Sequence, residues 1–346
     1  METLPSYNCI IHLEKFPTFS IEKAMCNHGF FMMAPNCWEP STKSFSRPLR
    51  LADSTSVMTF ISQPPGKDHL VIKVYGASIL WLKDELAIQS QVKRMLRLSD
   101  MDEQDVRDFH KLHPEAEAKG FGRLFRSPTL FEDVAKSLLL RFCPWKTSLD
   151  LAKALCFLQY KKFKSKRKRA NISSYGDFPN AEELASFSEK ELKGKGNFGY
   201  RARELIMLAK QVVDGEIYLS KFEKDHIGTE PNWSKLKING AGPFTIKTIM
   251  MCAGYYSYIP IDSETMRHMD EFHGLKVHKR KRGSINLQIR DKIQQIYKRY
   301  DPFQSLAYWF ELVNSYETEL GKELSELLPS EYHHVTGNYE KEKKKF

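Results

Sequence analysis

The order of strand-like and helix-like segments limits the fold of this chain more than any other sequence feature. Residues 1–80 contain short runs rich in β-branched or aromatic residues, separated by turn-rich stretches such as APNCWEPSTKS and QPPGKD. The runs are NCIIHLE, RPLRL, SVMTFIS and HLVIKVYG. Beyond about Ala77 the apolar residues recur with the spacing of amphipathic helices. Strands that precede helices, rather than alternating with them, predict an α+β fold with a small antiparallel sheet and a larger all-helical body.

The helical segments can be placed by their spacing and by their first residues. Helices are predicted over residues 82–98, 101–113, 127–143, 147–160, 180–193, 200–215, 289–300 and 305–321, and after Gly242 and Asp262. Asp100 and Asp102 are available to cap the second of them, and Ser127 with Pro128 would begin the third. The predicted domains are 1–115, with the sheet and the helices that follow it, and 116–330, which is helical. Residues 331–346 form a basic tail that we expect to be disordered.

Composition narrows the class of protein. The 346 residues are 41% hydrophobic and 12% aromatic, so the chain can bury sizeable cores and is not disordered throughout. Lys and Arg number 53 against 43 Asp and Glu, a formal net charge of +10, with a pI near 9.1. A polyanion is therefore a reasonable partner, although many enzymes with other partners are mildly basic too.

The cysteines are scattered along the chain and include no CxxC pair. This pattern argues against a disulfide framework, against structural zinc and against an iron–sulfur cluster. The N-terminus, METLPSYNCIIHLEKF, lacks the features of a signal peptide, and no window has 18 uninterrupted apolar residues. We therefore expect a reduced, intracellular protein with no membrane contact and no bound metal.

A pair of glycines precedes one predicted helix, in the stretch INGAGPFTIKTIMMC at residues 238–252. Glycine permits positive φ and close approach of another backbone at Gly240 and Gly242, and Pro243 suits the first helical position. The free N–H groups and positive dipole end of the following helix could then bind a phosphate oxygen. The alternative is a helix–turn–helix connection without a ligand.

An acidic residue follows where the chain returns from this helix. Asp262 stands 22 positions after Gly240, in YIPIDSET, between an apolar segment that contains Pro260 and the helical pattern SETMRHMDEF. It could be an ordinary N-cap residue, or a carboxylate that serves chemistry.

Together these segments resemble the helix-hairpin-helix (HhH-GPD) DNA glycosylases, and in particular their 8-oxoguanine and 3-methyladenine branch. Gly199–Arg203 (GYRAR) and Phe178-Pro179 are similar to segments of the 8-oxoguanine enzymes. So are Gly122–Arg126 followed by SPTLFEDVAKSLL, and Tyr300–Phe303 with SLAYWF. The matches run in the family's order from about residue 120 to 315. The resemblance implies a small N-terminal antiparallel sheet domain packed on an all-α glycosylase body, with the hairpin at 235–255.

The resemblance also implies roles for individual residues. Asp262 would be the catalytic carboxylate that assists cleavage of the bond between base and sugar. The DNA backbone would be contacted by residues of the hairpin, namely Gly240, Gly242, Thr245 and Lys247. Phe244 occupies the position of the lysine nucleophile of bifunctional members, which predicts a monofunctional enzyme that uses water. Two alternatives stay open: a bifunctional glycosylase/lyase using Lys247, and a catalytically silent DNA-binding protein that keeps the hairpin.

The base pocket departs from that of the 8-oxoguanine enzymes. Arg141 and Phe142, with Trp145, stand at the end of the helix predicted over 127–143 and could wedge into the duplex. Tyr308 stands in place of a glutamine that reads oxidised guanine, so 8-oxoguanine specificity is not implied. Aromatic residues, Phe244 and Tyr308 with Trp309 and Phe303, would suit a cationic alkylated purine. For Trp309 and Phe310 plain core packing is the favoured interpretation.

The remaining expectations concern partners and location. The expected partner is double-stranded DNA that contains a damaged base, bound by a monomer, and the DNA-facing basic set includes Tyr200, Arg201, Lys279, Arg280 and Lys281. The run at 161–169 carries seven charges in nine residues and could be a nuclear import signal, with an organellar location left open. We expect no cofactor and no iron–sulfur cluster; a monovalent cation at the hairpin carbonyls stays open.

Overall fold

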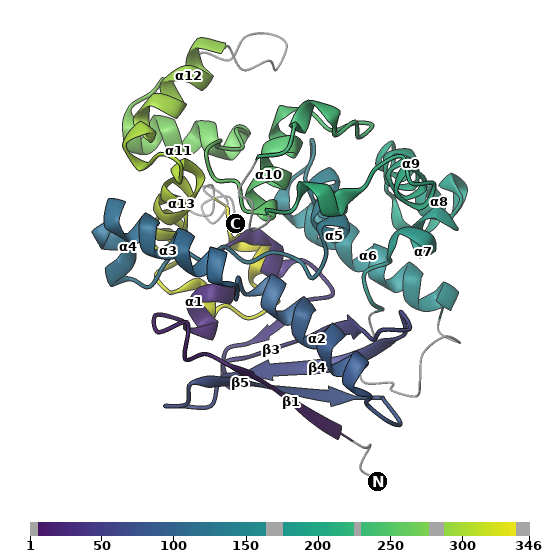
Figure 1. Cartoon of the computed structure of the whole chain (residues 1–346). Helices are drawn as coiled ribbons and strands as arrows, with labels where there is room; N and C mark the ends of the chain where they lie inside the picture. The colour runs from purple at the N-terminus through teal and green to yellow at the C-terminus, as the bar shows by residue number, and fades with distance from the viewer. Residues whose placement is uncertain (1–5, 164–175, 225–229, 277–286, 337–346) are drawn as a thin grey trace.

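The computed structural model describes residues 6–163, 176–224, 230–276 and 287–336. A five-stranded antiparallel sheet lies at one end of the molecule and helices form the rest, which confirms the α+β prediction (Figure 1). The strands are β1 (Ser6–His12), β2 (Cys37–Glu39), β3 (Ser44–Arg50), β4 (Ser56–Ser62) and β5 (His69–Tyr75). Within the described residues no helix has the length and apolar character needed to cross a bilayer.

The sheet has the strand order β1-β5-β4-β3-β2, and each neighbouring pair is antiparallel. Residues of β4 alternate between buried and half-buried, as a strand with one covered face requires. Ile72 of β5 pairs with Cys9 of β1 on one side and with Ile61 of β4 on the other. β2 lies in APNCWEPSTKS, which we predicted as turn-rich. Trp38 accounts for the difference, because its buried indole donates to the carbonyl of Ser325 (2.8 Å), a contact that local sequence does not reveal.

Most helices follow the sheet, as predicted, but α1 (Ile21–Met25) and η1 (Gly29–Met32) lie between β1 and β2. The α-helices that follow the sheet are α2 (Leu82–Met95), α3 (Asp100–Leu112), α4 (Pro114–Ala118), α5 (Leu130–Leu139), α6 (Trp145–Phe163), α7 (Ala181–Ala185), α8 (Glu189–Gly196), α9 (Arg201–Val213), α10 (Pro243–Ala253), α11 (Ser263–His273), α12 (Leu287–Ile296) and α13 (Gln304–Leu320). Short 3₁₀ helices are η1 (Gly29–Met32), η3 (Leu219–Phe222), η4 (Trp233–Lys235), η5 (Lys298–Tyr300), η6 (Leu324–Glu326) and η7 (Tyr332–His334). The predicted helix over 180–193 is two helices, because Ser188 caps a second one.

The residues predicted to cap two of the helices were wrong by one to three positions. The N-cap of α3 is Ser99, whose hydroxyl accepts from the amide of Asp102 (3.0 Å). The N-cap of α5 is Thr129, whose hydroxyl accepts from the amide of Glu132 (3.2 Å). Hydroxyls that precede the carboxylates in the chain therefore take the capping positions, and the acidic residues occupy the first turn, where the helix dipole favours them.

The buried apolar side chains form one continuous cluster that extends from Cys9 in β1 to Val335. The predicted boundary at 115/116 therefore does not separate two cores. The predicted tail also begins later than expected, because residues 331–336 pack on the body. Tyr332 is buried, and its carbonyl accepts from the indole of Trp145 (2.8 Å). Residues 337–346 lie outside the described part of the chain.

Candidate functional site

The glycine pair begins α10 as the sequence predicts. Gly242 is the N-cap and Pro243 the first helical residue, and the amide of Ile246 donates to the Gly242 carbonyl (3.0 Å). The preceding element, η4, is a single 3₁₀ turn rather than a full helix. Within the turn the amide of Ala241 donates to the carbonyl of Ile238 (3.1 Å). The monovalent cation at the hairpin carbonyls stays a prediction.

The two glycines meet different surroundings. Gly240 has φ +83°, and a Cβ there would lie 2.3 Å from the carboxylate of Glu204 and 2.6 Å from the guanidinium of Arg141. Gly242 has an ordinary φ, and a Cβ there would meet nothing within 4 Å. Gly240 is therefore required by the fold, whereas Gly242 leaves open space beside the first amides of α10. Of the two glycines, Gly242 is therefore the one with room beside it for a phosphate oxygen.

Asp262 lies at the N-terminus of α11. Its Oδ1 accepts from the amide of Thr265 (2.8 Å) and is 3.0 Å from the Thr265 hydroxyl, so the carboxylate caps the helix. Burial raises the pKa of Asp262, and the hydrogen bonds from Thr265 offset part of that rise. The capping interpretation and the chemical one are therefore compatible: the cap fixes the orientation of a carboxylate that the protein partly desolvates.

A cavity of about 320 Å³ lies against Asp262. Its walls come from segments far apart in the sequence: the region of η1, the α5–α6 connection, α10, the start of α11, and α13. The lining includes His28, Trp145, Phe244, Asp262, Tyr308 and Trp309. The volume lies within the range of pockets that hold small organic groups.

The aromatic side of the cavity differs in part from the sequence-based expectation. Phe244 and Tyr308 line it, and so does Trp309, for which the sequence favours core packing. Phe303 is absent from its lining, because its ring packs against Phe109 (6.0 Å between centroids). Phe310 is a core residue as expected.

Tyr308 reaches Asp262 through Thr265. The Tyr308 ring is buried, and its hydroxyl donates to the Thr265 hydroxyl oxygen (3.0 Å). Thr265 in turn contacts Oδ1 of Asp262. Tyr308 therefore serves two purposes: its ring bounds the cavity, and its hydroxyl holds the residue that orients the carboxylate.

His28 is a cavity residue that sequence reasoning missed. Its Nδ1 lies 3.2 Å from the carbonyl of Phe125, and burial lowers the pKa of the imidazole to about 3, so the ring is neutral near pH 7. The ring also meets Trp309 edge-on, with 4.6 Å between centroids. His28 belongs to no motif and comes from the N-terminal segment, so only tertiary packing brings it to the site.

The segment between α5 and α6 carries an exposed phenylalanine. Phe142 is 86% exposed and has φ +49°, a left-handed conformation that is unfavourable for a residue with a side chain. Neighbouring residues hold this conformation: Arg141 pairs with Glu204 (2.6 Å), and its carbonyl accepts from the hydroxyl of Tyr200 (3.2 Å) and from the guanidinium of Arg201. A large apolar side chain is thus presented to solvent from a fixed backbone.

Two of the side chains predicted to contact DNA are buried. We expected Arg201 to face DNA, but its side chain is only 7% exposed and binds the Phe142 segment instead. Tyr200 is exposed. The Thr245 side chain is buried, which leaves only its backbone amide for an interaction at the start of α10.

Lys247 is half-buried and absent from the cavity lining. Its ammonium lies 5.7 Å from the centre of the Tyr258 ring, and burial together with Arg290 lowers the pKa of Lys247. Lys279, Arg280 and Lys281 fall outside the described residues.

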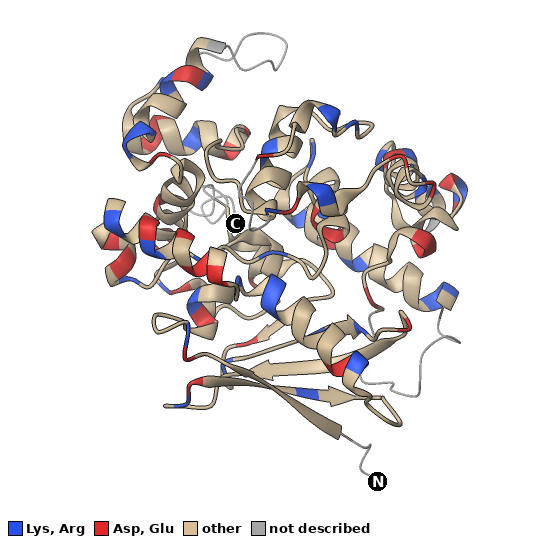
Figure 2. Cartoon of the chain, in the orientation of Figure 1, with Lys and Arg blue, Asp and Glu red and all other residues tan. Residues whose placement is uncertain are grey.

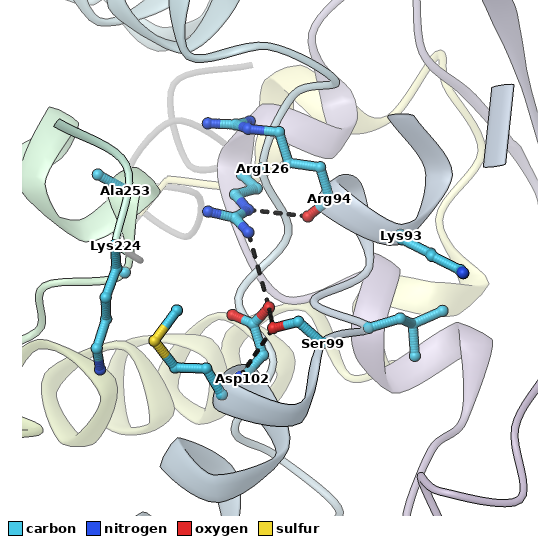
Figure 3. Close-up of a pocket in the computed structure, with 10 residues that line it drawn as sticks. Lys93, Arg94, Ser99, Asp102, Arg126, Lys224 and Ala253 are labelled. Atoms are coloured by element: carbon cyan, nitrogen blue, oxygen red, sulfur yellow. Dashed lines mark hydrogen bonds and ion pairs between the residues drawn. The ribbon is translucent and has the colours of Figure 1, made fainter. Parts of the chain in front are cut away.

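A second cavity, of about 200 Å³, lies between α2, the start of α3 and the end of α10 (Figure 3). Its cations are paired, because Arg94 binds Asp133 (2.8 Å) and Lys224 binds Asp105 (2.7 Å). Arg126 donates to the carbonyl of Arg94 (2.8 Å), and burial and neighbouring arginines lower the pKa of Arg126 to about 10. These contacts pair the buried cations of this cavity within the protein, while Lys93, which also lines it, is exposed.

Two arginines near this second cavity hold α10 in place. Arg97 donates to the carbonyls of Met251 (2.9 Å) and Cys252 (3.1 Å), and Arg126 donates to the carbonyl of Cys252 (3.0 Å). Cationic side chains thereby bind the last carbonyls of α10 and complement the negative end of its dipole. The helix that begins at the glycine pair is fixed at its far end by residues of the N-terminal half.

Comparisons with known proteins agree on the fold. No family model and no curated protein matches the sequence. MBOgg1, solved in complex with a low-affinity DNA ligand, is similar with a TM-score of 0.57 and 16% identity, over 92% of this chain and 100% of its own. The apo form of Clostridium acetobutylicum 8-oxoguanine glycosylase/lyase has a TM-score of 0.56 and 15% identity, over 90% and 98%. The 3-methyladenine DNA glycosylase from Archaeoglobus fulgidus has a TM-score of 0.56 and 15% identity, over 87% and 96%. At such identities the likeness shows that this chain has the fold of these glycosylases.

Proposed function

We propose that this chain is a base-excision repair DNA glycosylase that removes a damaged base from double-stranded DNA by hydrolysing its N-glycosidic bond, with Asp262 as the catalytic carboxylate. The observation that carries the proposal is the position of Asp262 in the wall of an aromatic cavity, one helix after the glycine pair. The fold shared with 8-oxoguanine and 3-methyladenine DNA glycosylases supports it.

The reaction requires the target base to leave the helix stack and enter a pocket. The aromatic cavity can receive a flipped base, because Phe244 and Trp309 offer ring surfaces on which it can stack. Phe142 is suited to fill the space that the base leaves, since its side chain is exposed and its backbone is fixed by Arg141 and its partners. Insertion of an apolar side chain between base steps is a known way to unstack DNA.

The chemistry follows from the charge that develops on the sugar. As the base departs, the deoxyribose acquires oxocarbenium character, and a nearby carboxylate stabilises it or accepts a proton from the attacking water. Asp262 is oriented for this by its capping bonds to Thr265. Because surrounding protein partly replaces water around the carboxylate, its field acts more strongly than it would in solvent.

The positions of Phe244 and Lys247 favour a monofunctional enzyme. Phe244, at the hairpin position where the resemblance leads one to expect a nucleophilic lysine, lines the cavity and cannot form a Schiff base. Lys247 lies one turn further on and does not line the cavity. Water is therefore the proposed nucleophile, and the abasic strand should remain intact.

The hairpin would bind the DNA backbone rather than read sequence. The open space at Gly242 lets a phosphate approach the first amides of α10, where the helix dipole favours a negative charge. The aromatic cavity favours a base with cationic or electron-poor character, such as an alkylated purine, over 8-oxoguanine. We propose that the protein acts as a monomer in the nucleus. The nuclear location rests on the basic run at 161–169, of which residues 164–169 lie outside the described part of the chain.

The substitution Asp262→Asn tests the proposal. Asparagine caps helices as well as aspartate does, so the variant should fold normally. Its single-turnover excision rate should fall by about 10²–10⁴-fold, the range for a positioned acid–base group. Asp270→Asn is the matched control, because Asp270 is an exposed carboxylate on the same helix. If Asp262→Asn keeps more than about a tenth of the wild-type rate, Asp262 is a cap only. Another group would then carry the reaction, whereas a wild-type chain that excises no base would favour a catalytically silent DNA-binding protein.

A further inference from the structure

We propose that His268, His273 and Glu311 form a binding site for one divalent transition-metal ion, best matched to Zn²⁺, at the far end of the helix that begins with Asp262. His268 and His273 lie on α11, and Glu311 lies on α13. Among the described residues this is the one group of three or more His, Cys, Asp or Glu side chains whose ligand atoms all lie within 4.8 Å of one another.

The distances fit a shared ion. Oε2 of Glu311 lies 2.9 Å from Nε2 of His273 and 3.3 Å from Nε2 of His268. Zinc binds nitrogen and oxygen ligands at about 2.0–2.2 Å, so tetrahedral ligand atoms lie roughly 3.3 Å from one another. Small side-chain rotations would place the three ligand atoms at bonding distance from one ion. Two imidazole nitrogens and a carboxylate oxygen are also the donor set that zinc prefers over magnesium or calcium.

Tyr297 is placed to orient the carboxylate. Its hydroxyl lies 2.5 Å from Oε2 of Glu311 and 3.3 Å from Nε2 of His273. The Tyr297 hydroxyl is the donor in the contact with the carboxylate. Carboxylate ligands of metals commonly receive such a hydrogen bond from a second residue.

The site is open on one side: the His268 side chain is fully buried, whereas those of His273 and Glu311 are 23% and 28% exposed. An ion can therefore enter from solvent and keep water as its fourth ligand.

A metal here would fasten two helices that frame the candidate active site. α11 carries Asp262 at its N-cap, and α13 carries Tyr308 and Trp309 in the cavity wall. The His268 ring meets Tyr308 edge-on, with 5.8 Å between centroids. The proposal is independent of the glycosylase proposal, and it does not conflict with the scatter of the cysteines, since none of the ligands is a cysteine.

The experiment uses the full chain, stripped with a chelator, exposed to one equivalent of Zn²⁺ or Co²⁺ and then desalted. We expect one bound metal per chain by elemental analysis, a visible spectrum of tetrahedral Co²⁺, and a higher melting temperature with Zn²⁺. His273→Ala and Glu311→Gln should lose the metal, the spectrum and the temperature shift. His12→Ala, at an exposed histidine of β1, should keep all three.

Tyr297→Phe separates a metal site from a hydrogen-bond network that binds no metal. Loss of the hydrogen bond to Glu311 should weaken Zn²⁺ affinity by about 10–100-fold without removing the ligands. Circular dichroism of each variant without metal checks the fold. The proposal is overturned if the wild-type chain retains no ion after desalting, or if His273→Ala and Glu311→Gln retain as much ion as wild type. In the first case the cluster is a hydrogen-bond network only, and in the second the ion binds elsewhere.

Discussion

At the scale of single residues, the carboxylate of Asp262 both caps α11 and faces the cavity. The capping bonds to Thr265 restrict its rotation, and Tyr308 holds Thr265 from the other side. An ordinary N-cap residue is solvated, whereas burial raises the pKa of this one. Retaining a partly desolvated acid costs stability, which is typical of groups kept for chemistry.

The raised pKa of Asp262 gives a prediction about pH. The reaction requires the ionised carboxylate, and a raised pKa means that the ionised fraction falls at a higher pH than for an ordinary aspartate. The single-turnover excision rate should therefore decline on the acid side with an apparent pKa above 3.8, the ordinary value. Rates are measured at saturating enzyme, and circular dichroism at each pH excludes unfolding. An acid limb at or below 3.8 would show that burial does not govern this group.

Phe142 supports a second prediction at this scale. Phe142→Ala should leave the free energy of unfolding unchanged or slightly higher, because the ring is exposed. The same change should raise the free-energy barrier to excision from duplex DNA by about 1–3 kcal/mol, because the stacking contribution of the ring is lost. Excision from single-stranded DNA should change little. Phe157→Ala is the matched control, since Phe157 is another exposed phenylalanine, on α6. Equal effects of the two substitutions on duplex excision would remove Phe142 from the DNA interface.

At the scale of elements, the hairpin separates two glycine requirements that look alike in sequence. Gly240→Ala places a side chain in a left-handed conformation, at a cost of roughly 1–2 kcal/mol, and against the Arg141–Glu204 pair. It should lower the free energy of unfolding, measured in urea. Gly242→Val should cost only about 1 kcal/mol of stability, because valine is a poorer N-cap than glycine. It should weaken binding to all duplexes alike, because the new side chain blocks the phosphate approach. Unaltered DNA affinity of folded Gly242→Val would mean that the turn is only structural.

Local signals predicted some elements well and others poorly. α10 and α11 begin where Pro243 and Asp262 indicated, because caps and first-turn prolines act through neighbouring residues. β2 was missed because its strand depends on Trp38 reaching Ser325 across the molecule. Arg201 was misassigned for a similar reason: its sequence motif does not reveal that the guanidinium turns inward to the carbonyl of Arg141.

At the scale of the whole molecule, the sheet end and the helical body share one core, and the candidate site joins the helical body to the segment around η1 that lies between β1 and β2. His28 reaches the cavity only through this packing, so no reading of the helical segment alone could have found it. Acidic side chains gather on α3 and α4 (Figure 2). Most of the excess positive charge lies in segments outside the described residues, including KSKRKRANISSY and VHKRKRGSIN.

The most direct test of the central claim is product analysis with a panel of duplexes, each carrying one modified base. The account predicts that the wild-type chain releases at least one damaged base, an alkylated purine foremost. The strand should then break only after alkali, and borohydride should trap no covalent protein–DNA adduct, since no Schiff base forms. Release of no base from any duplex would contradict the glycosylase proposal. A trapped adduct that disappears in Lys247→Ala would contradict the monofunctional mechanism and identify Lys247 as the nucleophile.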